Sequence, residues 1–331
     1  MYPMSRSIVS ALAITLALIA SSLAIADDIS SSKLNWEPLQ DDISRAELFS
    51  YVVKARIEEG AIPPGAEGPV SAPLKGNFTF PHDANIDDAT GLRRVDSIFG
   101  IDISHYTDSS LDLSSLRRQK VEFVYAKATQ GTKYGDNKFP EYWRVLADQP
   151  PNLRVLRGAY HFLSASGDGR AQADSFLQYV EKAGGFQPND LPPCVDLEWD
   201  VSKLGQPDRW LARSPDEIID ITLGWLQRVE AATGKIPMIY TNKAWWHSAI
   251  KSEAKFTRLE HYKIWIADYS GSNRVIEIPA VPNRVNAHVW QFTASSHLAN
   301  YSKDLDANIY KGSRDQFAID MQVSRSVIAE N

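Results

Sequence analysis

The chain has 331 residues, 44% hydrophobic and 23% charged, which is enough for one large barrel or two smaller domains. Its net charge of −6 argues against a nucleic-acid-binding protein, because a phosphate backbone favours a basic surface. The one cysteine, Cys194, excludes an internal disulfide, and beside Val195 we interpret it as a small buried hydrophobe rather than a nucleophile. No Cys/His cluster has metal-ligand spacing. The hydrolytic chemistry considered below requires neither a metal nor an organic cofactor, and we expect none.

Residues 1–26 have the pattern of a secretory signal peptide. Arg6 precedes an uncharged apolar run over residues 8–26, which ends in the small-x-small sequence Ala24-Ile25-Ala26. We expect cleavage after Ala26 and export of the protein, which is then secreted or periplasmic and has no second segment long enough to span a bilayer. An uncleaved membrane anchor is the alternative, since the run is nearly long enough to cross a membrane.

Residues 27–95 differ in pattern from the rest of the chain and are predicted to be an N-terminal extension or linker. The periodicity over 41–59 predicts one helix that ends at Gly60. The following stretch, to about residue 85, is rich in Pro and Gly and without periodicity, which is typical of an extended connector. This region either packs on the main domain or tethers it.

From Ser97 onward, short apolar runs alternate with amphipathic segments. Strands are expected over 98–103, 121–128, 155–160, 193–198, 236–241, 264–269, 288–293 and, more weakly, 305–309. Helices are expected over 111–118, 140–147, 169–183 and from a capping Ser214 to Gly234, with short or absent helices between the later strands. This order predicts an α/β fold: an irregular parallel (β/α) TIM-like barrel over 96–322, with a C-terminal tail at 323–331.

A doubly wound open sheet is the structural alternative to the barrel. No G-x-G-x-x-G or phosphate-binding loop follows the first strand, so this alternative has no nucleotide site to support it.

Polar residues gather at the expected C-terminal ends of these strands, where parallel barrels carry their active sites. They are Asp102, Lys127, His161, Asp196, Glu198, Asp268 and Gln291. Asp196 and Glu198 are two residues apart, so a strand places them on one face, where mutual repulsion raises a pKa and suits one carboxyl to donate a proton. Any one of these residues is more often a structural hydrogen-bonding group, but the whole set indicates a carboxylate-based hydrolytic site.

Several motifs occur in the order and rough spacing of one known family. They are GIDISHY at 100–106, FVYAKATQG at 123–131, GAYHF at 158–162, DLE at 196–198, WIADY at 265–269 and WQF at 290–292. Over residues 97–320 the chain therefore resembles the glycoside hydrolase family 25 muramidases, or lysozymes. The resemblance implies an irregular β/α barrel that cleaves the β-1,4 bond between N-acetylmuramic acid and N-acetylglucosamine in peptidoglycan.

The same resemblance assigns roles to particular residues. Glu198 would be the general acid, Asp196 would stabilise positive charge or orient the acetamido group, and Asp102 and Asp306 would be further catalytic-site carboxylates. Substrate binding is expected from strand-end and aromatic residues: Tyr106, Lys127, Tyr160, His161, Tyr240, Asp268, Tyr269 and Gln291. The chain departs from the family pattern at Gln130, where glutamate is usual, and at Asp268, where a neutral residue is expected.

Two other functions remain open from the sequence. One is a peptidoglycan-binding module without turnover, although binding alone does not require a proton donor. The other is a glycosidase that acts on chitin-like polymers. The expected partners are peptidoglycan glycan strands, with no nucleic acid and no membrane after signal cleavage, and the protein is expected to be a monomer.

Overall fold

The computed structural model describes residues 36–38, 74–201 and 206–329. The predicted signal peptide, its cleavage after Ala26 and the predicted helix over 41–59 lie outside the described residues. The chain divides into a unit at Met1–Asn35 and a unit at Trp36–Asn331, and only the second contains described residues.

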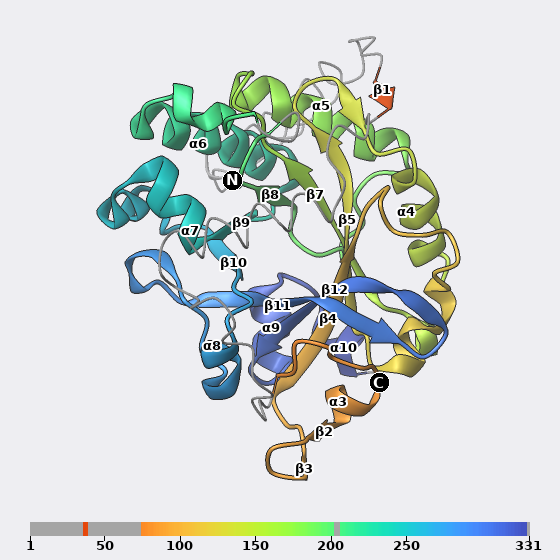
Figure 1. Ribbon diagram of the computed structural model, residues 1–331. Coiled ribbons are helices and arrows are strands. Elements are labelled where there is room, and N and C mark those ends of the chain that lie inside the picture. Colours follow the sequence, from red (N-terminus) through yellow and green to blue (C-terminus); the bar gives the residue numbers. More distant parts are fainter. Residues whose placement is uncertain (1–35, 39–73, 202–205, 330–331) are drawn as a thin grey trace, which may run out of the picture. The chain divides into compact units, whose positions relative to one another are not determined.

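Eight strands close into a barrel in this second unit (Figure 1). They are β4 (Ser97–Ile103), β5 (Phe123–Gln130), β7 (Leu156–Phe162), β8 (Cys194–Asp196), β9 (Met238–Asn242), β10 (Lys263–Ala267), β11 (Ala287–Leu298) and β12 (Tyr301–Lys311). Each strand pairs with the next one in this series, and β12 pairs with β4 to close the ring. The predicted barrel is confirmed, and all eight expected strands are present.

The last strand differs from the prediction of a parallel barrel. β12 runs antiparallel to both of its neighbours, β11 and β4, so the barrel is mixed. Only two residues separate β11 from β12, and a connection this short can only reverse the chain, because a parallel strand needs a long crossover. The antiparallel pairing places Asp306 opposite Asp102 and Asn308 opposite Gly100.

Helices cover the outside of the first half of the barrel. η1 (Leu113–Gln119), α4 (Phe139–Ala147), η2 (Pro151–Leu153), α5 (Gly169–Lys182), η3 (Arg209–Ala212) and α6 (Pro215–Thr233) follow the early strands. α6 begins at the predicted capping box of Ser214 and Glu217 and ends at Gly234 in the left-handed conformation.

The helices after β9 are short, as the sequence predicts. They are α7 (Lys243–Trp245), η4 (Trp246–Ile250), η5 (Glu253–Leu259), α8 (Gly271–Ile276) and η6 (Pro282–Arg284). α9 (Arg314–Asp320) and α10 (Arg325–Ala329) then contribute Phe317 and Ile328 to the same buried cluster as Ile98 and Leu156, near the starts of β4 and β7.

Large aromatic side chains fill the barrel interior because two strands carry glycine opposite them. A Cβ atom on Gly100 would lie 2.4 Å from the ring of Phe123, and one on Gly158 would lie 2.3 Å from the ring of Tyr125. Cys194 and Trp265 are buried in the same cluster as these rings. Burial raises the pKa of the Cys194 thiol well above its ordinary value, which fits a packing residue rather than a nucleophile.

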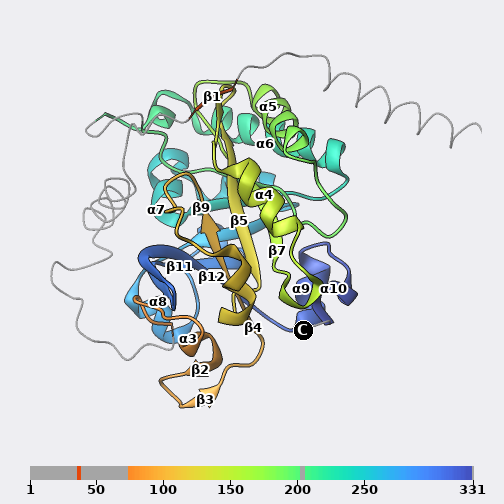
Figure 2. The same cartoon turned by 90° about the vertical axis from the view of Figure 1, so that its right-hand side faces the viewer.

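Residues 74–95, which the sequence assigned to the extension, pack on the barrel (Figure 2). Phe78 and Phe80 are buried, and the ring of Phe78 lies 5.0 Å from that of Phe99 and 5.1 Å from that of Phe292. α3 (His82–Asn85), β2 (Ile86–Asp87) and β3 (Leu92–Arg93) follow. Arg94 then donates to Glu277 over 2.8 Å in an ion pair, and both side chains of this pair are largely buried.

A second attachment lies at β1 (Glu37–Pro38), which pairs with β6 (Tyr134–Gly135) beside the end of β5. Trp36 precedes it, packs on Tyr179 with ring centroids 5.2 Å apart, and donates to Ser175 over 3.2 Å. The described chain therefore contacts the barrel on both sides of residues 39–73.

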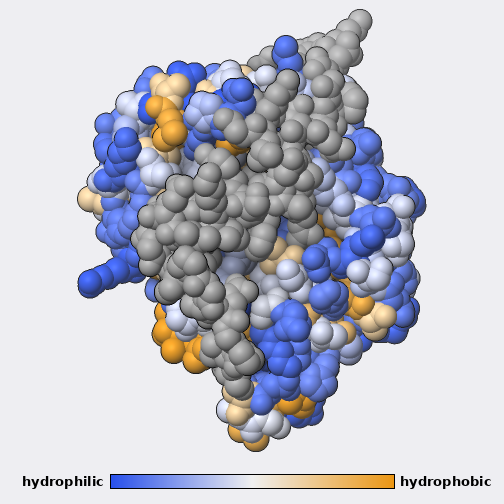
Figure 3. Space-filling model, viewed as in Figure 1, coloured by the Kyte–Doolittle hydropathy of each residue, from blue (hydrophilic) through white to orange (hydrophobic). Residues whose placement is uncertain are grey.

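The described surface in Figure 3 is mainly hydrophilic, and its hydrophobic side chains form small separate groups. Large hydrophobic side chains that are exposed include Leu92, Val95, Leu211, Ile276 and Ile278. Among the described residues, no helix has the length and apolar character needed to cross a membrane.

Candidate active site

The predicted strand-end residues converge because the strands that carry them end at one side of the barrel. β5, β7, β8, β9, β10 and β11 all run parallel to β4 through successive pairings. Across these pairings Asp102 lies opposite Asp306, Lys127 opposite Tyr160, and Asp196 opposite Tyr240. The structure therefore places charged residues from four strands around one end of the barrel.

Asp196 and Glu198 form a buried pair of acids at this end. β8 stops at Asp196, so Glu198 lies in the segment after the strand rather than on the strand itself, as the sequence suggested. Two backbone hydrogen bonds of 2.9 Å hold this segment: Leu163 donates to the Asp196 carbonyl, and Leu197 donates to the Tyr240 carbonyl. Both carboxyl side chains are more than nine-tenths buried.

Burial gives both acids an unusual affinity for protons. Burial, aided by Asp306 and Asp208 and opposed by Lys127, raises the pKa of Glu198 to about 7. Burial and the neighbouring Glu198 raise the pKa of Asp196 well above its ordinary value. Asp196 Oδ1 finds no hydrogen-bond partner among the described residues. The pair therefore retains a proton near neutral pH.

Lys127 is the cation that faces these acids. It is buried, its Nζ donates to Gln130 Oε1 over 2.9 Å, and it lies 4.8 Å from the ring centroid of Phe162. Burial lowers the pKa of Lys127, whereas Asp196, Asp136, Glu198 and Asp200 act in the opposite direction. Because its hydrogen-bond partner is a neutral amide, no neighbouring carboxylate at this contact offsets the positive charge that Lys127 exerts on the acids.

Asp102 is held by a set of hydrogen bonds from the later strands. Its Oδ2 accepts from Gln291 Nε2 and from Asn308 Nδ2, both over 2.8 Å. Gln291 Oε1 in turn accepts from Tyr240 over 2.7 Å and from Tyr269. These bonds favour an ionised Asp102 with a fixed orientation.

Tyr106 and Tyr160 lie near the same end but differ in exposure. Tyr106 follows β4, is 39% exposed and packs against His105 with ring centroids 3.9 Å apart. Burial raises the pKa of the Tyr160 phenol well above its ordinary value, with smaller contributions from Asp102, Asp196, Asp136 and Asp306. Tyr160 thus faces the acids and stays protonated.

His161 does not join the group with which the sequence placed it. Its ring is fully buried, lies 5.7 Å from that of Trp225 of α6 and 6.0 Å from that of Phe176 of α5, and hydrogen-bonds Thr129 and Gln172. Burial lowers its pKa to about 3. Neighbours on a strand alternate in direction, so Tyr160 faces the barrel interior and His161 the helices. We therefore withdraw His161 from the substrate-binding residues.

Asp268 is bound within its own loop. Its carboxylate accepts from the backbone of Ser270 over 3.0 Å and of Ala280 over 2.7 Å, and from Asn273 Nδ2 over 2.5 Å. These contacts give Asp268 a role in shaping the loop after β10, and its predicted contact with substrate stays a prediction.

The structure adds residues to which the sequence gave no role. Asn308 reaches Asp102 from β12, and Trp265 Nε1 donates to Asn308 Oδ1 over 2.8 Å. Asp208, buried beside the segment that follows Glu198, contributes to the raised pKa of Glu198. Asn308 lies two residues after Asp306 in the sequence, and this spacing was the only signal that could have found it.

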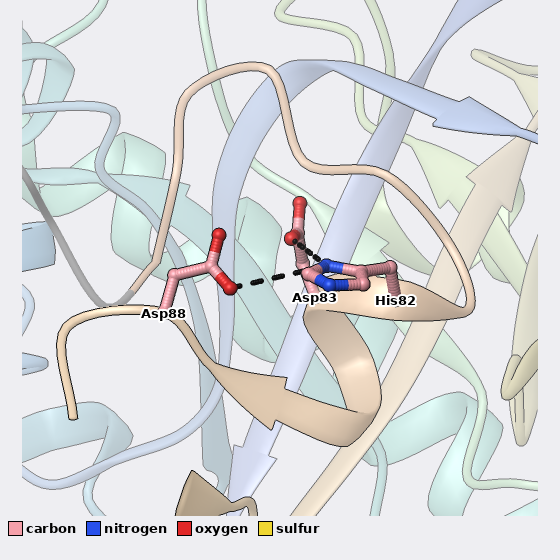
Figure 4. A group of neighbouring side chains, drawn as sticks. All are labelled: His82, Asp83 and Asp88. Carbon is pink, nitrogen blue, oxygen red and sulfur yellow. Dashed lines mark hydrogen bonds and ion pairs between the residues drawn. The ribbon is translucent and has the colours of Figure 1, made fainter. Parts of the chain in front are cut away.

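One cluster in the described part of the chain has the spacing of a metal site, and it lies within residues 74–95 (Figure 4). His82, Asp83 and Asp88 offer ligand atoms within 4.8 Å of one another. Lys75 Nζ already contacts both carboxylates, at 3.3 Å from Asp83 Oδ1 and in a short contact with Asp88 Oδ2. The ammonium group thus supplies the positive charge there, and we interpret the cluster as a set of ion pairs.

Comparisons with known proteins extend this description. The family model of glycosyl hydrolases family 25 matches residues 101–301. Lysozyme M1 of Streptomyces globisporus is 26% identical over 285 residues, which are 80% of this chain and 90% of that protein. An N,O-diacetylmuramidase of Arthroderma benhamiae is 32% identical over 166 residues, which are 49% of this chain and 65% of that protein.

Solved structures give the same result for the fold. A bacterial lysozyme from Streptomyces coelicolor superposes with a TM-score of 0.57 at 26% identity, covering 68% of this chain and 97% of that one. A muramidase from Trichobolus zukalii gives a TM-score of 0.54 at 28% identity, covering 68% and 99%. The family match includes Asp102, Asp196 and Glu198, while Asp306 lies just beyond its end.

Proposed function

The chain belongs to glycosyl hydrolases family 25 and is a glycoside hydrolase, and from this premise we propose that it is an exported muramidase. It cleaves the β-1,4 bond between N-acetylmuramic acid and N-acetylglucosamine in peptidoglycan. One observation carries the proposal most directly: Glu198 is buried at the C-terminal end of the barrel with its pKa raised to about 7. Such a carboxyl holds a proton at neutral pH and can give it to a glycosidic oxygen.

Glu198 acts as the general acid in this proposal. As the bond between the anomeric carbon and the glycosidic oxygen breaks, the Glu198 proton passes to that oxygen, and the leaving sugar departs as a neutral alcohol. Positive charge develops at the anomeric carbon and the ring oxygen of the other sugar, the oxygen of a water molecule bonds to that carbon, and one proton of this water is released to solvent. Glu198 recovers its proton from solvent for the next cycle.

The other carboxylates supply negative charge around the developing cation. Asp196 is two residues from Glu198, and its Oδ1 has no hydrogen-bond partner among the described residues, so it is available to an acetamido N–H or to the charged ring. Asp102 accepts hydrogen bonds from Gln291 and Asn308, and Asp306 lies opposite it across the β4–β12 pair. Lys127 lowers the pKa of both Asp196 and Glu198, which limits how many protons the cluster retains.

Aromatic and amide groups around the acids bind the glycan. We assign this role to Tyr106, Tyr160, Tyr240, Tyr269 and Gln291, with Asp268 at the edge of its loop. Tyr106 is the most exposed of the tyrosines and is suited to stacking on a sugar face. No step in this mechanism requires a metal or an organic cofactor.

A comparison of Glu198→Gln with the wild-type protein tests the assignment of the acid. The variant keeps the size and a hydrogen-bonding group at this position but has no proton to transfer. We expect release of reducing ends from purified peptidoglycan to fall by about 10²–10⁴-fold, with glycan binding retained. Absence of any reducing-end release by the wild-type protein, from several peptidoglycans, would contradict the proposal and favour a binding module.

Side-by-side digestion of peptidoglycan and chitin tests the substrate. We expect disaccharide-peptide products with N-acetylmuramic acid at the reducing end, identified by mass spectrometry after borohydride reduction. Faster hydrolysis of chitin would instead assign the barrel to a chitin-like polymer.

Export is tested separately from activity. The proposal predicts that the mature protein, recovered outside the cytoplasm, begins at Asp27. N-terminal sequencing measures this directly, and a mature protein that begins at Met1 would contradict it.

A further inference from the structure

Asp102 receives two hydrogen bonds from side-chain amides, and the orientation of each amide matters. An amide group presents an N–H donor on one side and a carbonyl acceptor on the other, and a half-turn exchanges them. A carboxylate is stabilised by the N–H side and repelled by the carbonyl side. Gln291 and Asn308 both present nitrogen to Asp102 Oδ2 over 2.8 Å.

Each amide oxygen accepts hydrogen bonds on the side away from Asp102, and for Asn308 the donor is a group that cannot accept. Gln291 Oε1 accepts from the hydroxyls of Tyr240 and Tyr269. Asn308 Oδ1 accepts from Trp265 Nε1 over 2.8 Å. An indole nitrogen is only ever a donor, so the Trp265 bond permits one orientation of Asn308 and excludes the other.

Trp265 and Asn308 lie inside the barrel, below the acids at the strand ends. Asn308 is fully buried, and Trp265 is 2% exposed. The Trp265 ring packs between Tyr125, at 4.9 Å between ring centroids, and Tyr240, at 5.0 Å. Asn308 lies opposite Gly100, one inward-facing position below Asp102 on β4. Neither side chain is therefore placed to touch a bound glycan.

We propose that Trp265 and Asn308 are positioning residues for Asp102, with Trp265 locking the Asn308 amide so that its N–H group points at the carboxylate. The inference rests on the proposed function for its kinetic consequences. It goes beyond that function because it gives Trp265 and Asn308, which lie inside the barrel, a role in the reaction that takes place at the strand ends.

Asp102 needs this support because two other acids lie near it. Asp306 lies opposite it on β12, and Asp196 interacts with it electrostatically from β8. The two acids repel a further negative charge at Asp102. Donors held in a fixed orientation offset this repulsion, whereas a carbonyl turned toward Asp102 would add to it.

Trp265→Phe removes the indole donor and keeps an aromatic ring in the barrel. We expect kcat to fall about tenfold, with KM changed less than about twofold, because the lost bond acts on the charged centre and not on glycan contacts. We also expect the acidic limb of the kcat/KM profile to move up by about one pH unit, because a carboxylate that loses a donor holds its proton to higher pH.

Trp246→Phe is the matched control. Trp246 is also fully buried and also loses one indole hydrogen bond, to the Ser252 carbonyl over 3.1 Å, but it lies in η4 outside the barrel. We expect this variant to lower the melting temperature without moving the pH profile. Equal changes of the pH profile in the two variants would reduce the role of Trp265 to packing and overturn the proposal.

Two substitutions at Asn308 test the other half of the contact. Asn308→Ala deletes the donor, and Asn308→Asp keeps an acceptor for Trp265 but sets a second carboxyl against Asp102. We expect the acidic limb to move to higher pH in both, and further in Asn308→Asp, because two adjacent carboxyls share a proton. A larger shift in Asn308→Ala would contradict the proposed geometry.

Nuclear magnetic resonance gives a readout that does not depend on activity. In the wild-type protein we expect the side-chain NH₂ signals of Asn308 to shift with pH as Asp102 titrates, and the midpoint to rise by about one unit in Trp265→Phe. An unchanged midpoint would overturn the inference even if the enzyme were fully active. A moved midpoint in a protein without muramidase activity would support the inference while the proposed function failed.

Discussion

Glu198 and Lys127 show how one buried cation sets the behaviour of several buried acids. Burial raises the pKa of Glu198 and of Asp196, and Lys127 opposes it in both. The hydrogen-bond partner of Lys127 is Gln130, at a position where the family resemblance leads one to expect glutamate. A glutamate there would offset part of the Lys127 charge, so this chain directs more positive charge at its acids.

Lys127→Met therefore should move the basic limb of the pH profile to higher pH. Without the ammonium group the pKa of Glu198 rises, the acid keeps its proton longer, and the limb shifts by about one unit while kcat falls. Gln130→Glu should shift it in the same direction by less. Both shifts are measured as kcat/KM between about pH 4 and pH 10.

Lys235→Met is the control for this pair of variants. Lys235 is a half-buried lysine that donates to the Pro188 and Gln322 carbonyls and precedes the start of β9, whereas the acids lie toward the strand ends. It should leave the limb in place. A Lys127→Met enzyme with an unmoved basic limb would show that Lys127 does not act on Glu198.

Glu198 also makes the stability of the folded protein depend on pH. Its pKa rises from an ordinary 4.5 to about 7 on folding, so its contribution is complete below the unfolded value and is lost as pH rises through the folded one. Glu198→Gln avoids this loss. The difference in unfolding free energy between the variant and the wild type should therefore grow in favour of the variant from about pH 5 to pH 8, by about 3 kcal/mol at most.

Urea denaturation at the two pH values measures this difference. A stability difference between the variant and the wild type that is the same at both pH values would mean that Glu198 is not held protonated by the fold.

The sequence could predict the acids because each follows a recognisable strand, and strand ends converge in a barrel. It also named Gln291, Tyr240 and Tyr269, but it could not predict that Trp265 and Asn308 support Asp102. Trp265 begins the WIADY motif and Asn308 lies two residues after Asp306, but neither pattern gives the residue a role, and only the register between β4 and β12 brings Asn308 to Asp102. His161 was misplaced because it sits next to Tyr160, and the alternation of a strand sends neighbours to opposite faces.

At the scale of elements, the barrel depends on glycine where two strands pass large rings. Gly100 and Gly158 leave room for Phe123 and Tyr125, whose bulk fills the barrel below the acids. The two glycines begin the GIDIS and GAYHF motifs, so part of the pattern that identifies the site is a packing requirement.

Gly158→Ala should destabilise the protein by about 1–3 kcal/mol, because the new methyl group would lie 2.3 Å from the Tyr125 ring. Gly224→Ala, in the middle of α6, meets nothing closer than 3.6 Å and should stabilise by about 0.5–1 kcal/mol. Chemical denaturation of both variants measures these effects. The penalty at Gly158 should shrink in a Tyr125→Leu background, and an undiminished penalty would assign it to another contact.

Periodicity predicted the position of every barrel strand but not the direction of the last one. The apolar pattern of β12 is the same whichever way the strand runs, and the deciding feature is the two-residue connection from β11. The expected connector around residue 80 was also incomplete as a description. Its Pro and Gly content indicated a loop, but Phe78 and Phe80 within it belong to the core, where Phe78 packs against Phe99 and Phe292.

At the scale of the whole molecule, residues 74–95 are part of the folded unit. Phe78 and Phe80 are buried, and the Arg94–Glu277 pair joins this segment to the end of α8. Removing residues 74–95 would expose the aromatic rings of the barrel on which they pack and would take away one of the ion-pair partners of Glu277.

Two shortened chains test this directly. A chain that begins at Leu74 retains both phenylalanines, and one that begins at Asp96 lacks them; both lack β1 and Trp36. We expect the shorter chain to lose several kcal/mol of unfolding free energy relative to the longer one, about 1.5–3 kcal/mol for each phenylalanine. Identical urea midpoints in the two chains would show that residues 74–95 contribute nothing to stability.

The antiparallel β12 has a consequence for the time at which the protein can fold. The hydrogen bond between Asn308 and Asp102 joins residues 206 apart in sequence, and the ring cannot close until the ribosome has made nearly the whole chain. Until then β4 and β11 present unpaired edges, which are slow to find partners and prone to aggregate. Late closure suits the export that we propose, because a chain that has not yet folded can still be threaded through a translocation channel. It also makes the nascent protein dependent on whatever shields those two edges during synthesis.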